Sequence, residues 1–432
     1  MKRRTVLKNF FAVAVPAAVS MSVSALSAAN ALAAGMEHAA AVPGPSPLYG
    51  RWAASNARRI SAVIEQFGSA SISYVPSRRP YVVFDWDNTS IMNDCEEALF
   101  MYQIEHLAFQ LEPDEFARLL RQDVPEGPFK AAAGYVTRDA RPVLMQDLAD
   151  DISFDYRWLH AAQGKGDSLA QIQTSAQFQD FRAKLYFMYE AICDTHPLDI
   201  GYKWIITFFT NMRPQQLQAL MLESIQHGLG DALRKVRYES PASLPGKAGL
   251  VATSFFHGLR INEDIVSLMH TLRANGIDVF VSTASLDDVV RVFASDPNFG
   301  YGVAPENVIG LGLEMQDGKY TSTYRKNWHF NWGPGKTIGI RNVLGARGEP
   351  LMVFGDSDGD AWMLKDFSTT QVGVIINRLK TGPIGELSAR AAGTVGQDAA
   401  RFVLQGRNEH TGLTMPDEHS LKYGQSKNKL LA

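Results

Sequence analysis

The stretch Tyr81-Val82-Val83-Phe84-Asp85-Trp86-Asp87-Asn88-Thr89 decides the fold of this chain. Its first four residues are apolar, which is typical of a buried strand in a parallel sheet. Asp85 and Asp87 follow where this strand ends, and ligands of open α/β sheets bind beyond the carboxyl ends of the strands. Two carboxylates held together repel unless a cation joins them or one keeps a proton. The alternative is an Asx-turn that only closes the strand, and residues further along the chain decide between the two.

Two later apolar segments, 277–281 and 350–354, are predicted as strands of the same sheet, and 372–377 is predicted as its last strand. The polar residues that follow the first two are Ser282, Thr283, Asp356 and Asp360. Lys336 begins a predicted helix between them. Because parallel strands end at one edge of a sheet, we expect these groups to meet the Asp85–Asp87 pair there. Carboxylates hold a hard cation such as Mg²⁺, while a hydroxyl and an ammonium bind phosphoryl oxygens.

A long segment without strand signals, residues 93–256, separates the first strand from the later ones. Apolar residues recur at helical spacing in 97–111, 115–120 and 178–192, and Pro and Gly interrupt the segment repeatedly. A crossover between neighbouring parallel strands needs far fewer residues. The segment is therefore predicted as a mostly helical domain inserted into an α/β core.

The whole chain is expected to have five parts. They are an export signal (1–33), an N-terminal linker and helix (34–78), the α/β core in two pieces (79–92 and 257–400), the helical insertion (93–256) and a C-terminal tail (401–432). The tail is polar with few core-forming residues, so we predict an irregular surface segment.

Residues 1–33 have the layout of a signal peptide, with a basic start, an apolar run and small residues at the end. The pair Arg3-Arg4 is typical of a twin-arginine signal, and an uncleaved membrane anchor is the alternative. The segment carries four basic and no acidic residues, so its removal changes the net charge from −3 to −3 − 4 = −7. A nucleic-acid partner requires a surface rich in positive charge, and the net charge of the mature chain is negative. We expect a periplasmic or secreted protein with no stable membrane insertion after cleavage.

The chain has two cysteines, Cys95 and Cys193, and both fall in the predicted insertion. In an oxidising compartment they could form a disulfide. Two buried thiols are the alternative, and the sequence leaves both open, as it does the oligomeric state.

Four ordered motifs of the haloacid dehalogenase superfamily resemble segments of this chain. The segments are Asp85-Trp86-Asp87-Asn88-Thr89, Ser282, Lys336 and Gly355-Asp356-x-x-x-Asp360. The resemblance covers about residues 80–377, with the insertion at that family's first cap position. It implies a Rossmann-like core with a parallel sheet and an inserted helical cap.

The resemblance also implies a role for each residue. Asp85 would be the nucleophile that forms an aspartyl phosphate, and Asp87 would protonate the leaving alcohol and then activate water. The implied phosphate-binding residues are Ser282, Thr283 and Lys336. The implied Mg²⁺ site consists of Asp85, the Asp87 backbone carbonyl and Asp356, with Asp360 in support.

The expected activity is that of an exported, Mg²⁺-dependent phosphomonoesterase acting on a small phosphate ester. Within the superfamily, the export signal, Asn93-Asp94 and the run Gly355–Asp360 most resemble exported phosphorylcholine phosphatases. A quaternary ammonium must be held by aromatic faces and a carboxylate. The candidate residues after the nucleophile are Trp86, Glu96, Glu97, Phe100 and Tyr102, of which Glu97 with one aromatic on its helix face is preferred. The alternatives are a phosphatase for another ester, a phosphomutase and a non-catalytic phospho-ligand binding protein.

Overall fold

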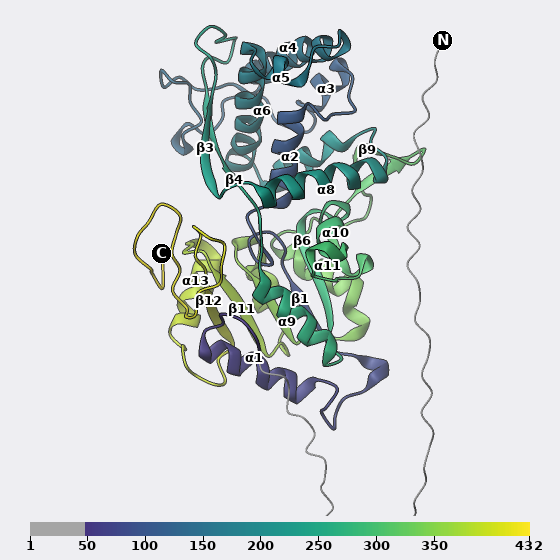
Figure 1. The fold of residues 1–432 in the computed structure, drawn as a ribbon, viewed down its shortest axis with the longest axis vertical. Helices are drawn as coiled ribbons and strands as arrows, with labels where there is room; N and C mark the ends of the chain where they lie inside the picture. Colours follow the sequence, from purple (N-terminus) through teal and green to yellow (C-terminus); the bar gives the residue numbers. More distant parts are fainter. Residues whose placement is uncertain (1–47) are drawn as a thin grey trace, which may run out of the picture. The chain divides into compact units, whose positions relative to one another are not determined.

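The computed structural model describes residues 48–432, so the predicted export signal and most of the linker lie outside the described residues. Six parallel strands form the central sheet in the order β12-β11-β10-β1-β6-β7 (Figure 1). Their bounds are β1 Tyr81–Phe84, β6 Asp278–Leu286, β7 Val308–Leu311, β10 Met352–Gly355, β11 Val372–Asn377 and β12 Phe402–Gly406. The predicted α/β fold with a parallel sheet is confirmed.

Strand register determines which residues meet at the carboxyl edge of the sheet. Phe84 of β1 pairs with Phe354 of β10 on one side and with Val281 of β6 on the other. The next residues are Asp85 after Phe84, Gly355 after Phe354 and Ser282 after Val281. The register therefore places Asp85 beside Ser282 and beside the turn that begins with Asp356.

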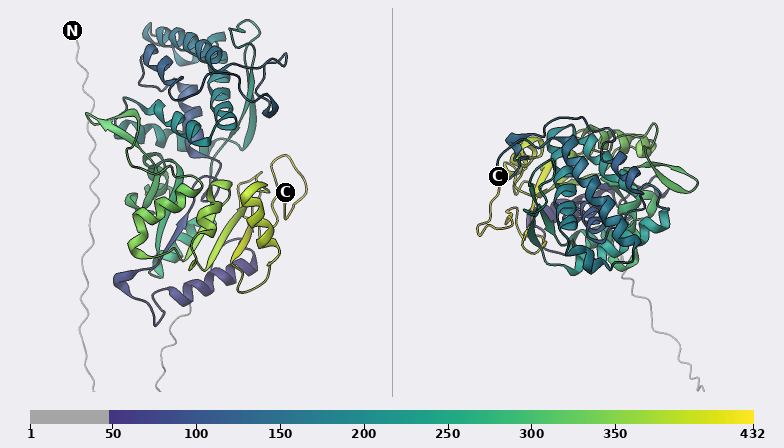
Figure 2. Two further views of the ribbon diagram at one scale, coloured as in Figure 1. Left: turned by 180° about the vertical axis from the view of Figure 1, so that it is seen from behind. Right: turned by 90° about the horizontal axis from the view of Figure 1, so that it is seen from above.

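Helices cover both faces of the sheet (Figure 2). Val82 and Phe84 of β1 face a core shared with α1 (Ala54–Phe67), α9 (Glu263–Ala274) and α10 (Asp287–Ser295). The alternate residues of β1 face a second core. The helices of that second face are α11 Pro334–Leu344, α12 Ala361–Lys365 and α13 Gly382–Ala392. The run of four apolar residues in β1 follows from this burial on both sides.

The insertion between β1 and β6 consists mainly of helices, as expected. They are α2 Cys95–His106, α3 Pro113–Leu119, α4 Met145–Gly164, α5 Leu169–Gln173, α6 Ala176–Thr195, α7 Leu198–Ile206 and α8 Pro214–Gly230. Aromatic side chains fill their core; the Phe116 and Tyr156 rings, for example, stack with centroids 3.8 Å apart. One feature differs from the expectation, because β3 (Arg234–Glu239) and β4 (Ala252–His257) form an antiparallel hairpin. Mostly polar residues at alternating positions, with no long apolar run, hid these strands from the sequence pattern.

Two other short strand pairs complete the described structure. β2 (Ile91–Met92) pairs with β5 (Arg260–Ile261), where the chain leaves and re-enters the core. β8 (Leu313–Gln316) and β9 (Lys319–Tyr324) form a hairpin. In residues 48–432, no helix combines the length and the apolar character that a membrane span requires.

The predicted end of the sheet is wrong. β12 lies in the segment predicted as an irregular tail, and it pairs in parallel with β11 from Gly373↔Phe402 to Asn377↔Gly406. All five residues of β12 are buried, and turns of the tail cover its end, with the Gly406 N–H donating to the Asp417 carbonyl at 3.0 Å. Only three successive apolar residues mark this strand, which is too weak a signal to separate it from a polar tail.

Both cysteines are free thiols, so the disulfide hypothesis is wrong for this structure. Cys95 is fully buried at the first position of α2. Cys193 lies in α6, where its sulfur packs against the backbone of Gly201 in α7.

Candidate active site

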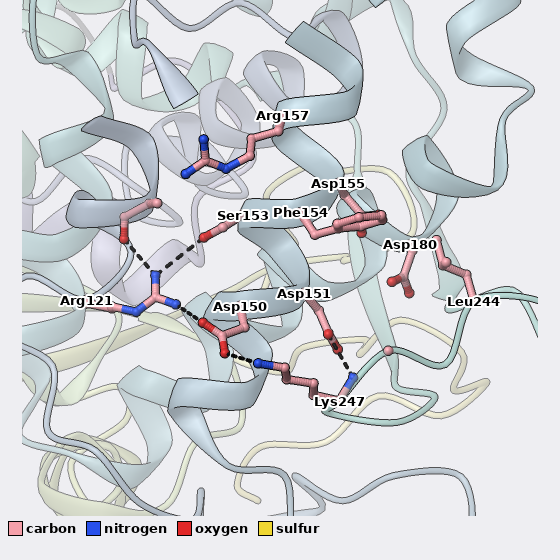
Figure 3. Close-up of a pocket in the computed structure, with 12 residues that line it drawn as sticks. Arg121, Asp150, Asp151, Ser153, Phe154, Asp155, Arg157, Asp180, Leu244 and Lys247 are labelled. Carbon is pink, nitrogen blue, oxygen red and sulfur yellow. Dashed lines mark hydrogen bonds and ion pairs between the residues drawn. The ribbon is translucent and has the colours of Figure 1, made fainter. Parts of the chain in front are cut away.

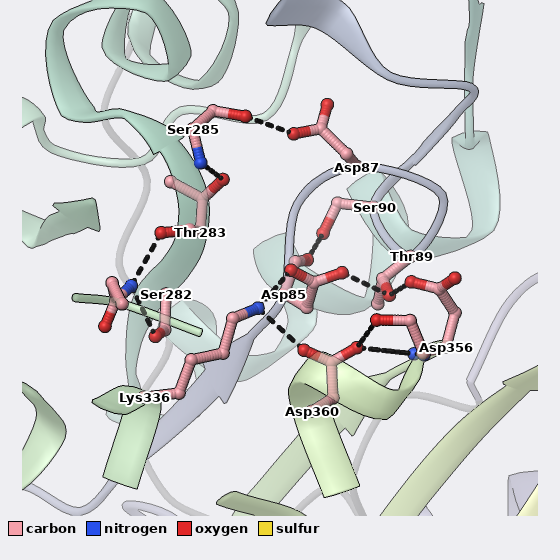
Figure 4. Close-up of polar contacts among 12 residues, drawn as sticks. Asp85, Asp87, Thr89, Ser90, Ser282, Thr283, Ser285, Lys336, Asp356 and Asp360 are labelled. Carbon is pink, nitrogen blue, oxygen red and sulfur yellow. Dashed lines mark hydrogen bonds and ion pairs between the residues drawn. The ribbon is translucent and has the colours of Figure 1, made fainter. Parts of the chain in front are cut away.

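Three carboxylates converge at the carboxyl edge of the sheet (Figure 4). Asp85 follows β1, while Asp356 and Asp360 lie in the turn after β10. One oxygen of each lies within 4.8 Å of the others, and all three side chains are buried. Carboxylate oxygens at this spacing are suitable ligands for a hard cation such as Mg²⁺. The cluster could therefore hold a metal ion.

Lys336 joins two of these carboxylates from the start of α11. Its Nζ donates to Asp85 Oδ1 and to Asp360 Oδ1, each at 2.6 Å. Burial lowers the pKa of Lys336, but the charges of Asp360 and Asp85 outweigh this and raise it. The pKa of Asp85 is raised well above its usual range by burial and by the charge of Asp360, and Lys336 offsets part of this. Lys336 thus stays cationic beside the predicted nucleophile.

Asp356 is held by a hydroxyl on one side and a guanidinium on the other. Thr89 Oγ1 lies 2.8 Å from Asp85 Oδ2 and 2.9 Å from Asp356 Oδ1, so it bridges the two carboxylates. Arg378, which follows β11, donates from Nη1 to Asp356 Oδ2 at 2.7 Å. Burial raises the pKa of Asp356, but Arg378 outweighs it, so the net shift is downward. Arg378 was not among the residues expected from the sequence, although a charged residue directly after a predicted strand of this sheet was an available signal.

Asp360 shapes the acidic turn as well as contacting Lys336. Its Oδ2 accepts the backbone N–H groups of Asp356 and Ser357 at 3.0 Å each. The neighbouring Asp358 points elsewhere and accepts the N–H of Ile384, in the first turn of α13, at 2.9 Å. Of these two aspartates, only Asp360 belongs to the cluster.

Asp87 lies apart from the three converging carboxylates and beside Ser285 (Figure 4). Its Oδ1 accepts the N–H of Cys95 at 2.8 Å, and its Oδ2 accepts the Ser285 hydroxyl at 2.8 Å. Burial raises the pKa of Asp87, and these hydrogen bonds counteract only part of the shift. A carboxyl group with a raised pKa holds its proton more readily than an exposed one, as a general acid must.

Ser282 and Thr283 are close to the cluster but do not line its cavity. Ser282 Oγ accepts from Asn331 Nδ2 at 3.1 Å, and Thr283 Oγ1 accepts the N–H of Ser285 at 3.1 Å. Ser285, which the sequence analysis did not select, does line the cavity. The phosphate-binding role of Ser282 and Thr283 stays a prediction.

A cavity of about 300 Å³ opens between the core cluster and the insertion. Six acidic residues line it: Asp85, Asp87, Asp94, Glu96, Glu97 and Asp356. Three basic residues and three aromatic residues also line it: Lys336, Arg378, Lys380, Tyr189, Tyr202 and Trp332. The cavity therefore brings carboxyl groups, cations and aromatic faces together in one space.

Glu96 and Glu97 are the carboxylates that α2 contributes. Glu96 Oε1 accepts the N–H of Leu286 at 2.8 Å, and burial raises its pKa to about 8. Glu97 receives the hydroxyls of Tyr186 and Tyr189 at 3.3 and 3.4 Å. Burial and the charge of Glu190 raise the pKa of Glu97 to about 7. Neither residue is a solvated helix end.

The aromatic residues suggested by the sequence do not line this cavity. Trp86 packs against Tyr301 and Phe293 in the core. Phe100 packs within the insertion, and Tyr102 stacks on His106. The cavity takes its aromatic faces from residues distant in sequence from α2, which periodicity along that helix could not reveal.

A larger cavity, of about 600 Å³, lies within the insertion and contains none of the predicted site residues (Figure 3). Asp151, Asp155 and Asp180 line it. Lys184, beneath them, is fully buried and lies 2.9 Å from Asp151 Oδ2 and 2.7 Å from Asp180 Oδ2. Burial and the charge of Asp180 raise the pKa of Asp155 to about 9. Lys184 thus offsets the charges of Asp151 and Asp180, and these carboxylates do not converge on a ligand site.

Three comparisons with known proteins agree with this geometry. A model of the haloacid dehalogenase-like hydrolase family matches residues 208–365. Phosphorylcholine phosphatase of Pseudomonas aeruginosa is 23% identical over 346 residues, which is 72% of this chain and 76% of that protein. The crystal structure of a conserved protein of unknown function from Anaerococcus prevotii is similar with a TM-score of 0.82 and 30% identity, covering 88% of this chain and 98% of that chain. The structural similarity thus spans the core and the insertion together.

Proposed function

The chain belongs to the haloacid dehalogenase superfamily of hydrolases, and from this premise we propose that it is an exported, Mg²⁺-dependent phosphomonoesterase with phosphorylcholine as its substrate. The observation that carries the proposal is the convergence of Asp85, Asp356 and Asp360, two of them bound to Lys336, in a cavity lined by carboxyl and aromatic groups.

Asp85 is proposed as the nucleophile. Its Oδ1 lies against the Lys336 ammonium, which keeps positive charge where a phosphoryl group would dock. Attack of the carboxylate on phosphorus forms an aspartyl phosphate and releases the alcohol. Water then cleaves this intermediate and restores the carboxylate.

Asp87 is proposed as the general acid and base. It lies on the side of the cavity that faces the insertion, where the leaving group would lie. The Ser285 hydroxyl and the Cys95 N–H fix its carboxylate in one orientation. It would protonate the departing alkoxide and then take a proton from the attacking water.

Mg²⁺ would be held by Asp85 and Asp356, with Asp360 and the Asp87 carbonyl in support. The oxygen-only donor set fits this ion. When bound, the ion would neutralise phosphate charge during transfer.

The cationic leaving group is proposed to bind at Glu97. This carboxylate lines the cavity together with the rings of Tyr189 and Tyr202. A quaternary ammonium cannot donate hydrogen bonds from its nitrogen, so a carboxylate and aromatic faces are what it requires. The similarity to a phosphorylcholine phosphatase supports the same substrate.

The proposed site of action is outside the cytoplasm. The basic, apolar and small-residue order of residues 1–33 supports export. Fractionation of cells that express the full chain, with N-terminal sequencing of the mature protein, tests this.

A phosphate-release assay on an aryl phosphate, with Mg²⁺ and with EDTA, tests the activity. We expect release that depends on Mg²⁺. No release under any metal condition would favour a binding protein that has kept the fold.

The substrate is tested by kcat/KM for phosphorylcholine, phosphorylethanolamine, phosphoserine and the aryl phosphate. We expect phosphorylcholine to be the best of the four. Glu97→Gln should reduce its advantage roughly tenfold, because the carboxylate charge is removed while the shape is kept. Glu223→Gln, an equal charge change at an exposed residue of α8, is the control. Equal kcat/KM values for all four esters would show that the substrate is another small phosphate ester.

A further inference from the structure

The C-terminal segment after β12 reaches the catalytic cluster. Arg407, directly after β12, is almost fully buried and donates from Nη1 to the backbone carbonyl of Asn88 at 2.8 Å. Asn88 follows Asp87 and has a left-handed backbone with φ of 61°. Arg407 therefore stabilises the turn that carries the proposed general acid.

Glu409 connects Arg407 to the metal-ligand side of the cluster. Its Oε1 lies 3.3 Å from Arg407 Nη2 and 3.9 Å from Arg378 Nε. Arg378 in turn donates to Asp356 Oδ2 at 2.7 Å. A continuous chain of charges thus runs from the Asn88 turn to Asp356.

The backbone around Glu409 fixes it in this place. Its N–H donates to the Leu421 carbonyl at 2.8 Å, and its Oε2 accepts the N–H of Tyr423 at 3.2 Å. Its side chain is only 12% exposed. The tail is therefore an ordered part of the site, although its sequence resembles a surface segment.

This chain holds two cations and two carboxylates, but one of the carboxylates, Asp356, is the proposed metal ligand. Apart from Asp356, the buried Arg407 and the partly exposed Arg378 are offset by a single carboxylate, that of Glu409. Burial, and to a lesser extent the charge of Arg378, lower the pKa of Arg407 to about 10. A divalent cation at Asp356 has to bind against this charge.

We propose that Glu409 is a positioning residue of the active site: it offsets the charge of Arg378 and Arg407 and so determines how tightly the cluster binds Mg²⁺. This inference rests on the proposed function, because it takes Asp356 as a Mg²⁺ ligand. It assigns to the tail a role in metal affinity, which is separate from the role of the substrate pocket.

Calorimetric titration of the mature protein with MgCl₂, without substrate, tests the proposal independently of turnover. Glu409→Gln should weaken Mg²⁺ binding roughly tenfold, because the positive charge beside Asp356 is no longer offset. Arg378→Gln should tighten binding, because it removes the cation paired with Asp356. The double variant should bind within about threefold of the wild type, since the two changes compensate. Asp417→Asn, the same loss of charge at a half-exposed residue of the tail, should leave binding unchanged.

Two outcomes would overturn the inference. They are wild-type affinity in Glu409→Gln, and a double variant as weak as Glu409→Gln alone. If Glu409→Gln does not fold, as judged by thermal unfolding without Mg²⁺, Arg378→Gln decides, and unchanged or weaker binding there rejects the proposal. Failure of the wild type to bind Mg²⁺ would instead reject the metal dependence of the proposed function.

Discussion

Two buried groups of aspartates surround one lysine each, one in the core and one in the insertion. In the core, Lys336 lies between Asp85 and Asp360. In the insertion, Lys184 lies between Asp151 and Asp180. Both lysines are almost inaccessible to solvent, and both groups border a cavity. By composition and burial the two regions are nearly equivalent.

The difference lies in how the backbone delivers the carboxylates. The core carboxylates follow parallel strands, so their oxygens converge at one edge of the sheet. In the insertion, Asp151 lies on α4 and accepts the N–H groups of Lys247 and Ala248 at 2.8 and 2.9 Å, so its lone pairs are already used. Within residues 48–432, only the core brings three carboxylates within reach of one metal ion. Convergence, rather than burial of charge, distinguishes a candidate site from a structural ion network.

The largest expected effect is on kcat, and it should occur in the core group of aspartates but not in the group of the insertion. Asp85→Asn should lower kcat by about 10⁴-fold or more, because the amide cannot attack phosphorus. The melting temperature should change little. Asp155→Asn, the matched substitution in the insertion, should keep kcat near that of the wild type. Steady-state phosphate release by both variants decides, and near-normal turnover by Asp85→Asn would eliminate the mechanism.

The second prediction concerns stability: here the substitution in the insertion should have the large effect on folding, and the one in the core the large effect on activity. Lys184→Met should destabilise the protein by about 3–5 kcal/mol, because Asp151 and Asp180 are left as uncompensated buried charges. Urea unfolding measures the loss, and the folded fraction should retain its specific activity. Lys336→Met is the counterpart, and it should abolish activity. A Lys184→Met variant with unchanged stability would mean that this pair contributes no net stabilisation.

The third prediction concerns metal affinity. Asp356→Asn should raise the Mg²⁺ concentration for half-maximal activity roughly a hundredfold, because a charged oxygen ligand is lost. Asp87→Asn should lower kcat without this shift, since its carboxylate lies outside the converging group. Activity at a series of Mg²⁺ concentrations provides the measurement. An unchanged Mg²⁺ requirement in Asp356→Asn would remove Asp356 from the metal site.

The smallest effect is the pH dependence of stability in the insertion. Burial and Asp180 raise the pKa of Asp155 to about 9, far above the value of an unfolded aspartate. The folded state then holds a proton that the unfolded state lacks, so this contribution is complete below about pH 4 and is lost as the pH rises towards 9. Asp155→Asn should therefore stabilise the protein at pH 8 and have little effect at pH 4. Thermal unfolding at both pH values tests this, and equal shifts would show that Asp155 does not hold the proton.

The sequence pattern predicted the elements of the core that local chemistry controls. An apolar run followed by Asp85 predicts a buried strand and a polar strand end, and the structure contains β1 there. Lys336 near the start of a helix is likewise a local pattern, which α11 bears out. The same reasoning missed β12, because three apolar residues before a polar tail do not distinguish an edge strand from a loop.

The long-range contacts of the site could not be read in this way. Glu97 lies in the cavity, but the aromatic side chains beside it are two tyrosines of α6 rather than a residue of its own helix. The helix periodicity of α2 describes only its own faces, and it carries no information about which distant helix covers them. Packing of the insertion on the core decided this residue's environment.

By itself, the sequence determined the strand ends, the order of the acidic and basic groups along the chain, and the helical character of the insertion, because these depend on residues near one another. Only the tertiary structure decided that Ser282 and Thr283 lie behind the cavity wall, that Arg378 pairs with Asp356, and that Lys184 is buried in the insertion. Arg407 binds the Asn88 carbonyl across 319 residues. Such contacts follow from strand register and from the packing of helices and tail on the sheet, since no local propensity specifies which distant group fills the space beside a given side chain.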